Sequence, residues 1–313
     1  MRYASLAAPF DSHQAHEFGA RAVETDRVIF SRILVATDFS PTSQRALLFA
    51  LVLAGRYAST VYLAHIIPER PPESPHGHSV DAHREVERRM EEFVRAITGN
   101  APSCTMLIED GEGPLSLWVA IERLINKHKI DLIVAGTRGL GARSEPFIGS
   151  GAEQIFRHAT CPVLTIGPAT QADNLLEIVF KNVLYVTDFG PSAERALAYV
   201  ISVAHEFDAR VRFLHVVEDM EGSGPQVLEH LRQIHIQRMR HSLSASHAAD
   251  VKADFCVRFG DVVEEILIAS REFRGDSIVM GAKATAGWAG HVPLSTAYNV
   301  VAKASCPVLT VRA

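Results

Sequence analysis

The residues best suited to binding chemistry form a glycine-rich loop with the pattern G-x2-G-x9-G-S. Its fixed positions are Gly136, Gly139, Gly149 and Ser150. Because glycine has no Cβ, Gly136 and Gly139 can adopt left-handed backbone conformations and admit phosphate oxygens to main-chain N–H groups. Gly149 and Ser150 open a predicted helix, whose first N–H groups have no partners and attract anions. The pattern therefore predicts a phosphate-binding loop rather than an ordinary glycine-rich surface turn.

Charged and polar side chains accompany this loop. Arg138 and Arg143 lie within it and add positive charge, while Thr37 and Asp38 end the first predicted strand at the same edge of the sheet. A carboxylate at that edge can accept hydrogen bonds from ribose hydroxyls or an adenine amine. An aspartate before a helix is also a common cap or turn residue, and Asp188 repeats the position in a second copy. Both interpretations of Asp38 therefore stay open.

Other candidate sites are weaker. Neither a Walker A sequence nor a GxGxxG after the first strand is present, which argues against a P-loop ATPase and a Rossmann dehydrogenase. His76, His78 and His83 cluster in a proline-rich region with no cysteine nearby, so we expect no metal site there. His65 and His215 occupy matching strand ends and are expected to be packed, hydrogen-bonded side chains. No Ser-His-Asp arrangement can be assigned by spacing, and we expect no catalytic residue.

The elements that position the loop occur twice. Residues 33–41 return as 183–191, and 159–165 return as 304–310, with the intervening motifs in the same order. The repeat is too long for a solenoid unit, so it indicates a duplicated domain. We expect an N-terminal extension over 1–31, a first domain over 32–168, a linker over 169–179 and a second domain over 180–313.

Each copy alternates short apolar runs with longer amphipathic ones. Continuously apolar runs such as 132–135 are typical of strands that are buried on both faces of a parallel sheet. The alternation predicts an α/β protein of two tandem doubly wound open sheets, each with five mainly parallel strands and helices on both faces. In the first copy the predicted strands are 32–37, 60–67, 103–109, 130–136 and 162–167, and the helices are 42–57, 80–98, 114–128 and 150–159. Ligands of such sheets bind beyond the carboxyl ends of the strands.

The second copy departs from the loop pattern. Gly281 and Ser295 remain, but Ala284 replaces the second glycine and Leu294 replaces the glycine before the helix. A leucine there would fill space that a phosphate needs. We therefore expect the second copy to bind no ATP and to act as a structural or regulatory partner.

Composition excludes several classes of protein. The formal net charge of -5 argues against a nucleic-acid binder. No apolar run reaches the ~18 residues of a membrane helix, and we read no signal peptide in the N-terminal extension. The four cysteines form no CxxC pair, and Cys161 and Cys306 sit in matching segments, as buried structural thiols would. We expect a cytoplasmic protein with no membrane partner.

Over both copies the sequence resembles the universal stress protein family, through the loop, the strand-end Asp38 and the terminal Cys-Pro-Val-Leu segments. The resemblance implies that the loop surrounds the phosphates and ribose, that the end of the first strand lines the adenosine, and that Ile66 touches the adenine. Mg²⁺ is the implied companion of the triphosphate. The implied ATP-binding residues are Ala36, Thr37, Asp38, Ile66, Gly136, Arg138, Gly139, Gly149, Ser150 and Gly151.

The resulting prediction is a cytoplasmic ATP-binding stress-response or signalling protein. We expect the copies to pack through their last strands as an intramolecular pseudo-dimer, and family analogy adds a homo-oligomer of the whole chain. We also expect a protein partner, which the sequence does not identify. Two alternatives remain: a slow ATPase or autophosphorylating enzyme, and a nucleotide-independent scaffold. The loop indicates phosphate, so it leaves ADP, AMP and cyclic nucleotides open beside ATP.

Overall fold

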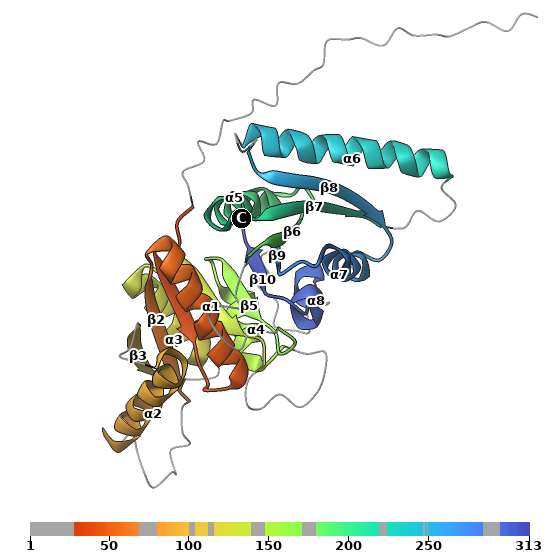
Figure 1. The fold of residues 1–313 in the computed structure, drawn as a ribbon. Helices are drawn as coiled ribbons and strands as arrows, with labels where there is room; N and C mark the ends of the chain where they lie inside the picture. The colour runs from red at the N-terminus through yellow and green to blue at the C-terminus, as the bar shows by residue number, and fades with distance from the viewer. Residues whose placement is uncertain are drawn as a thin grey trace, which may run out of the picture.

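The computed structural model describes most of the chain as an α/β assembly built on one twisted sheet (Figure 1). The described residues are 28–68, 80–99, 104–111, 116–138, 148–170, 180–218, 224–246, 248, 250–283 and 295–313. None of the helices in these parts of the chain has the length and apolar character to cross a membrane.

The N-terminal half follows the predicted alternation. Every strand and helix predicted for it is present, with ends that differ from the prediction by two residues at most. Its elements are β1 (Arg32–Ala36), α1 (Pro41–Tyr57), β2 (Thr60–Ile67), α2 (Val80–Thr98), β3 (Thr105–Asp110), α3 (Ser116–His128), β4 (Leu132–Gly136), α4 (Ser150–His158) and β5 (Val163–Ile166).

The C-terminal half repeats this order, as the duplication predicts. Its elements are β6 (Asn182–Val186), α5 (Pro191–Phe207), β7 (Arg210–Val217), α6 (Pro225–Ala245), β8 (Lys252–Phe259), α7 (Val262–Phe273), β9 (Ser277–Gly281), α8 (Thr296–Lys303) and β10 (Val308–Val311). Pro41 and Pro191 are the first residues of their helices, where a missing N–H leaves no hydrogen bond unmade.

The two five-stranded sheets join into one sheet of ten strands, in the order β3-β2-β1-β4-β5-β10-β9-β6-β7-β8. Pairing is parallel within each half and antiparallel between β5 and β10, where Leu309 faces Leu164. The hydroxyl of Thr165 donates to the Val308 carbonyl at 3.0 Å, and that of Thr310 donates to Val163 at 3.3 Å. The predicted packing through the last strands is therefore confirmed, and the two halves share one continuous backbone ladder.

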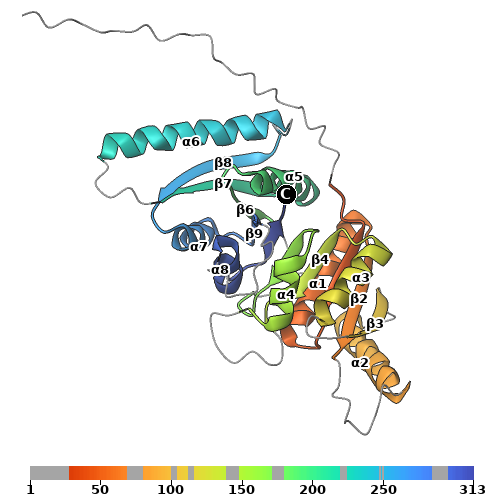
Figure 2. The same ribbon diagram turned by 180° about the vertical axis from the view of Figure 1, so that it is seen from behind.

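The core differs on the two faces of the sheet. On one face, the buried side chains of α1, α2, α5 and α6 form a single cluster that crosses from one half to the other. On the opposite face, α3 and α4 cover the first half and α7 and α8 cover the second, in two separate clusters (Figure 2). The first face therefore fixes the two halves to each other by continuous apolar packing.

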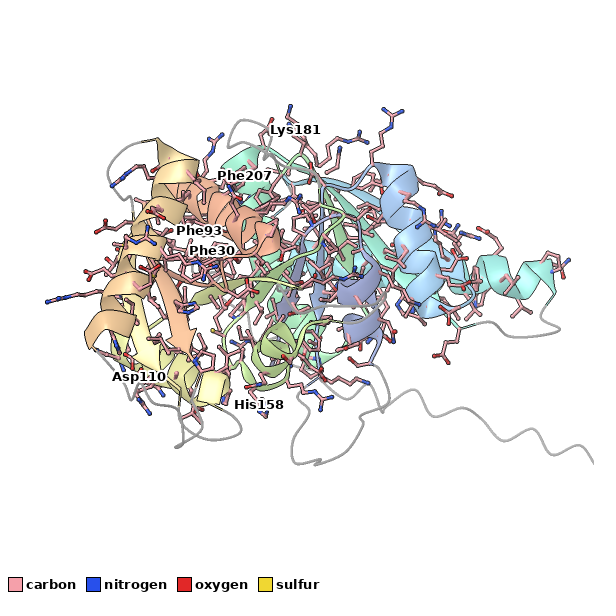
Figure 3. All side chains as sticks on the ribbon, turned by 90° about the horizontal axis from the view of Figure 1, so that it is seen from below. Phe30, Phe93, Asp110, His158, Lys181 and Phe207 are labelled. Carbon is pink, nitrogen blue, oxygen red and sulfur yellow. The ribbon has the colours of Figure 1, made fainter. Side chains whose placement is uncertain are left out.

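Phe30 closes this junction, although the sequence places it in the N-terminal extension. Its ring is 2% exposed and contacts Tyr57 at 5.1 Å and Tyr199 at 5.7 Å between ring centroids. The hydroxyl of Tyr57 also lies 3.1 Å from that of Ser202 in the other half. Figure 3 shows the dense side-chain packing around Phe30.

An aspartate ties the first strand of each half to the loop before its fourth strand. Asp131 accepts hydrogen bonds from the amides of Ser31 and Arg32. Asp276 accepts at 2.6 Å and 3.0 Å from the amides of Lys181 and Asn182. Burial raises the pKa of Asp276 to about 6, and these backbone hydrogen bonds only partly oppose the rise.

We expect Asp276 to make stability depend on pH. Since its pKa is higher in the folded than in the unfolded chain, its contribution is fully present below about pH 4 and is lost as the pH rises through about 6. The loss is about 3 kcal/mol. Urea unfolding of wild type and Asp276→Asn from pH 4 to pH 7 measures it: the variant should show a flatter decline. If the free energy of unfolding of the two proteins fell equally with pH, the raised pKa of Asp276 would be contradicted.

Candidate functional site

Three adjacent strands bring the predicted site residues to one edge of the sheet. β1 lies between β2 and β4, with Ala36 beside Ala64 on one side and Ala135 on the other. The carboxyl ends of β1, β2 and β4 therefore meet, and with them Thr37, Ile66 and Gly136. This is the edge at which open α/β sheets bind ligands.

The start of α1 holds the start of the loop. Ser40 is the N-cap, and its side chain accepts from the amide of Ser43 at 3.2 Å. The hydroxyl of Thr42 donates to the carbonyl of Arg138, so the first residues after β4 are tied to the first turn of α1. Thr42 was not predicted from the sequence. Its position in the first turn of a capped helix, near the end of the first strand, could have indicated it.

Asp38 has a turn role that the structure shows directly. Its Oδ1 accepts from the amide of Ser40 at 3.0 Å, and Asp188 accepts from Gly190 at 2.9 Å in the second half. The intervening Phe39 has a φ of 65°, an uncommon conformation for a bulky residue that this turn requires. Because both halves make the same turn, it belongs to the fold, and nucleotide contact by Asp38 stays a prediction.

Thr37 and His65 are locked together behind this turn. Thr37 is buried, its hydroxyl lies 3.0 Å from that of Ser43, and its carbonyl lies 2.8 Å from Nδ1 of His65. Burial lowers the pKa of His65, so the ring is neutral at pH 7. His215 repeats the contact with Thr187 at 2.8 Å. The prediction that these histidines are packed, hydrogen-bonded residues is confirmed.

Gly136 departs from the sequence expectation. Its backbone is not left-handed, and that part of the prediction is wrong. The glycine is required because a Cβ would lie 2.9 Å from backbone and side-chain atoms of Thr42, where α1 crosses the end of β4. At Gly281 a Cβ would lie only 2.6 Å from the amide nitrogen of Ala193. Close helix packing thus explains why both halves keep this glycine, including the half whose loop is degenerate.

The N-terminus of α4 is open towards the site. Gly149 is its N-cap, with φ -64° and ψ 151°, and supplies no side-chain cap. Its amide donates to the carbonyl of Thr137 at 2.7 Å, which holds the end of the loop against the end of β4. Ser150 is exposed. Glu153, the acidic residue of the first turn, pairs with Arg157 at 2.6 Å, which offsets its charge near this helix end.

The N-terminus of α8 in the second half is closed by its own side chain. Ser295 is the N-cap and accepts from the amide of Tyr298 at 3.2 Å, so its hydroxyl satisfies one of the donors that an anion would use. Ser192, which occupies the position of Thr42, accepts instead from the amide of Ala313 at 3.1 Å. The two helix starts are therefore chemically different despite their common fold.

Several predicted positions lie outside the described residues. These are Gly139, Arg143, Ala284 and Leu294 in the two loops, and His76 and His78 in the proline-rich segment. Nε2 of His83 lies 3.5 Å from Oδ2 of Asp110. Within the part of the chain that the structure describes, no group of three or more His, Cys, Asp or Glu could hold a metal ion.

Comparison with known families matches both halves. The model of the universal stress protein family fits residues 30–167 and 180–312. A universal stress protein of Thermus aquaticus is 29% identical over 141 residues, which is 44% of this chain and 99% of the relative. A universal stress protein of Methanocaldococcus jannaschii is 27% identical over 143 residues, covering 44% of this chain and 84% of the relative. Each of these two relatives matches less than half of the chain.

A solved structure matches the tandem arrangement. The universal stress protein from Archaeoglobus fulgidus covers 91% of this chain and 97% of its own, with a TM-score of 0.64 and 19% identity. A functionally unknown protein from Pseudomonas aeruginosa gives a TM-score of 0.59 at 16% identity, covering 91% and 93% of the two chains. At these identities the likeness shows a shared fold.

Proposed function

The chain belongs to the universal stress protein family, and from this premise we propose that it is a cytoplasmic stress-response or signalling protein that binds one ATP in its first domain. The observation that carries the proposal is the uncapped N-terminus of α4, at the carboxyl edge of β1, β2 and β4. Unpaired amides and the helix dipole at such an end favour a phosphate group.

The nucleotide would lie on the α3 and α4 side of the sheet. Ile66 belongs to the buried cluster on that side, and Ala36 packs against it. The adenine would contact Ile66, and the ribose would lie near the end of β1. The phosphates would reach the turn after Gly136 and the first amides of α4. The residues proposed for ATP are Ala36, Thr37, Asp38, Ile66, Gly136, Arg138, Gly139, Gly149, Ser150 and Gly151.

Magnesium fits this site only as a companion of the triphosphate. The described residues offer no cluster of metal-binding side chains, whereas Mg²⁺ commonly binds through substrate phosphates, one or two carboxylates and water. Asp38 is the carboxylate at this edge. When bound, Mg²⁺ would neutralise phosphate charge, while Thr42 and Gly149 hold the two ends of the loop against the sheet.

The second domain is proposed to be structural or regulatory. Its loop carries Ala284 and Leu294 in place of two glycines, and the hydroxyl of Ser295 already caps its own helix. Cytoplasmic location is supported by the cysteines, which are free. Burial raises the pKa of Cys306 to about 11, so this thiol stays protonated at neutral pH.

Quantifying the nucleotide released from denatured protein, followed by titration of stripped protein with Mg-ATP, tests this function. We expect about one adenine nucleotide per chain and a single binding site. Two equal sites would contradict the proposed asymmetry between the domains. No released nucleotide and no binding would reject the function and favour a nucleotide-independent scaffold.

A further inference from the structure

Helix α4 belongs to the first half but packs into both halves. Ile155 lies in the core cluster beneath α3 and α4, whereas Phe156 lies in the cluster of the second half. On the first-half side, His158, labelled in Figure 3, stacks on Trp118 at 5.6 Å between ring centroids. Figures 1 and 2 both show α8 beside α4 on the other side. The helix is therefore held between its own domain and the other one.

Tyr298 of α8 packs against α4 and lies in the same core cluster as the residue before its N-cap. Its ring meets Phe156 edge-on at 6.0 Å, and it is buried in the same cluster as Ile148, the residue before the N-cap Gly149. Burial raises the pKa of the Tyr298 phenol, and the neighbouring backbone of Ile148 opposes that rise. The phenol therefore lies beside the residue that precedes the N-cap of α4.

Arg312 holds the opposite end of the same helix. From just beyond β10, its guanidinium donates to the carbonyls of Phe156, Arg157 and Ala159 at the C-terminus of α4. The last carbonyls of a helix are available to such donors, and a cation at a helix C-terminus is also favoured by the helix dipole. The second half thus contacts α4 at both ends.

Among the described residues, the first half has no side chain that makes the equivalent contacts with α8. The residue equivalent to Arg312 in the first half is Gly167, and a Cβ there would already lie 3.3 Å from the carbonyl of Ala304, at the end of α8. Glu153 stands where the second half has Tyr298, and it pairs within α4 with Arg157. Tyr298 and Arg312, which belong to the half with the degenerate loop, therefore contact α4 of the half with the intact loop.

We propose that the second half positions the phosphate site of the first half, with Tyr298 and Arg312 as positioning residues that fix α4 and the described residues at its start, Ile148 and Gly149. This inference rests on the proposed function, since it assigns the degenerate domain a role in nucleotide binding. Neither residue touches the nucleotide: both act by holding Ile148, Gly149 and the first amides of α4 in place.

The test compares Tyr298→Phe with Tyr57→Phe in the full chain. Each variant removes one phenol hydroxyl at the junction between the halves, but that of Tyr57 lies on the α1 and α5 face, away from Ile148. ATP affinity is measured by calorimetry and the exchange of the Ile148 amide by NMR. Tyr298→Phe should weaken ATP binding about fivefold, as expected when one polar contact that orders Ile148 is lost. It should also speed exchange at Ile148, whereas Tyr57→Phe should leave both unchanged.

The two measurements separate the possible failures. Unchanged ATP affinity in Tyr298→Phe, or an equal loss in both variants, would overturn the positioning role. If the wild type binds no ATP, the proposed function fails, and the exchange rate decides the inference alone: unchanged protection of the Ile148 amide in Tyr298→Phe would overturn it.

Discussion

Replacing Gly149 by leucine should lower the affinity for Mg-ATP by at least about a hundredfold, which corresponds to about 2.7 kcal/mol. The change places in the first half the residue that the second half carries as Leu294. Its side chain would occupy the space in front of the first amides of α4, where the phosphates are proposed to lie. Isothermal titration of the stripped protein measures the loss.

The fold should survive this substitution. Gly149 has φ -64° and ψ 151°, an extended conformation that leucine adopts without strain, and leucine keeps the amide that bonds Thr137. Circular dichroism and the unfolding midpoint should therefore stay close to those of the wild type. The matched control is Leu294→Gly, which makes the reverse change in the second half and should leave the affinity of the first site within twofold. Wild-type affinity in Gly149→Leu would argue that α4 is not the phosphate site.

Replacing Gly281 by alanine should lower the free energy of unfolding by about 3 kcal/mol, at the upper end of the usual cost of overpacking a core. The new Cβ would lie 2.6 Å from the amide nitrogen of Ala193 and 2.8 Å from the carbonyl carbon of Ser192. Both are backbone atoms of the first turn of α5, so the clash cannot be relieved by rotating a flexible side chain. Urea unfolding monitored by circular dichroism measures the change.

Gly55→Ala is the control for this prediction. Gly55 lies within α1, and a Cβ there would meet nothing within 4 Å. Alanine at a helix interior position is favoured over glycine by about 0.8–1.0 kcal/mol, so this variant should be slightly more stable than the wild type. Equal stability of Gly281→Ala and the wild type would show that α5 can shift away from β9, and that close packing does not explain the glycine.

The apolar patterns of the sequence were sufficient to predict most of the fold. The run at 132–135 is continuously apolar because β4 is buried on both faces, and burial of that kind is typical of a parallel sheet covered by helices. The matching segments around Cys161 and Cys306 likewise predicted equivalent last strands. These features are local, since each is encoded by a few consecutive residues, and a single sequence displays them directly.

The role of the glycines depended on tertiary contacts. The spacing of Gly136 and Gly149 predicted a phosphate loop. It could not show that a glycine is required at position 136 because α1 crosses the end of β4 there. Phe30 lies before the first strand, and nothing near it in the sequence marks a core residue. It is buried because Tyr57 and Tyr199 come from different halves to enclose it.

The sequence by itself determined the class of fold, the duplication and the position of the intact loop. Only the tertiary structure decided that both ends of α4 lie against the other half, at Tyr298 and at Arg312. These residues lie about 140 positions or more from the groups they contact. Contacts of that kind arise from the antiparallel pairing of β5 with β10, which sets the two halves side by side. A local pattern records the burial and conformation of its own residues, and it carries no information about which distant surface will cover them.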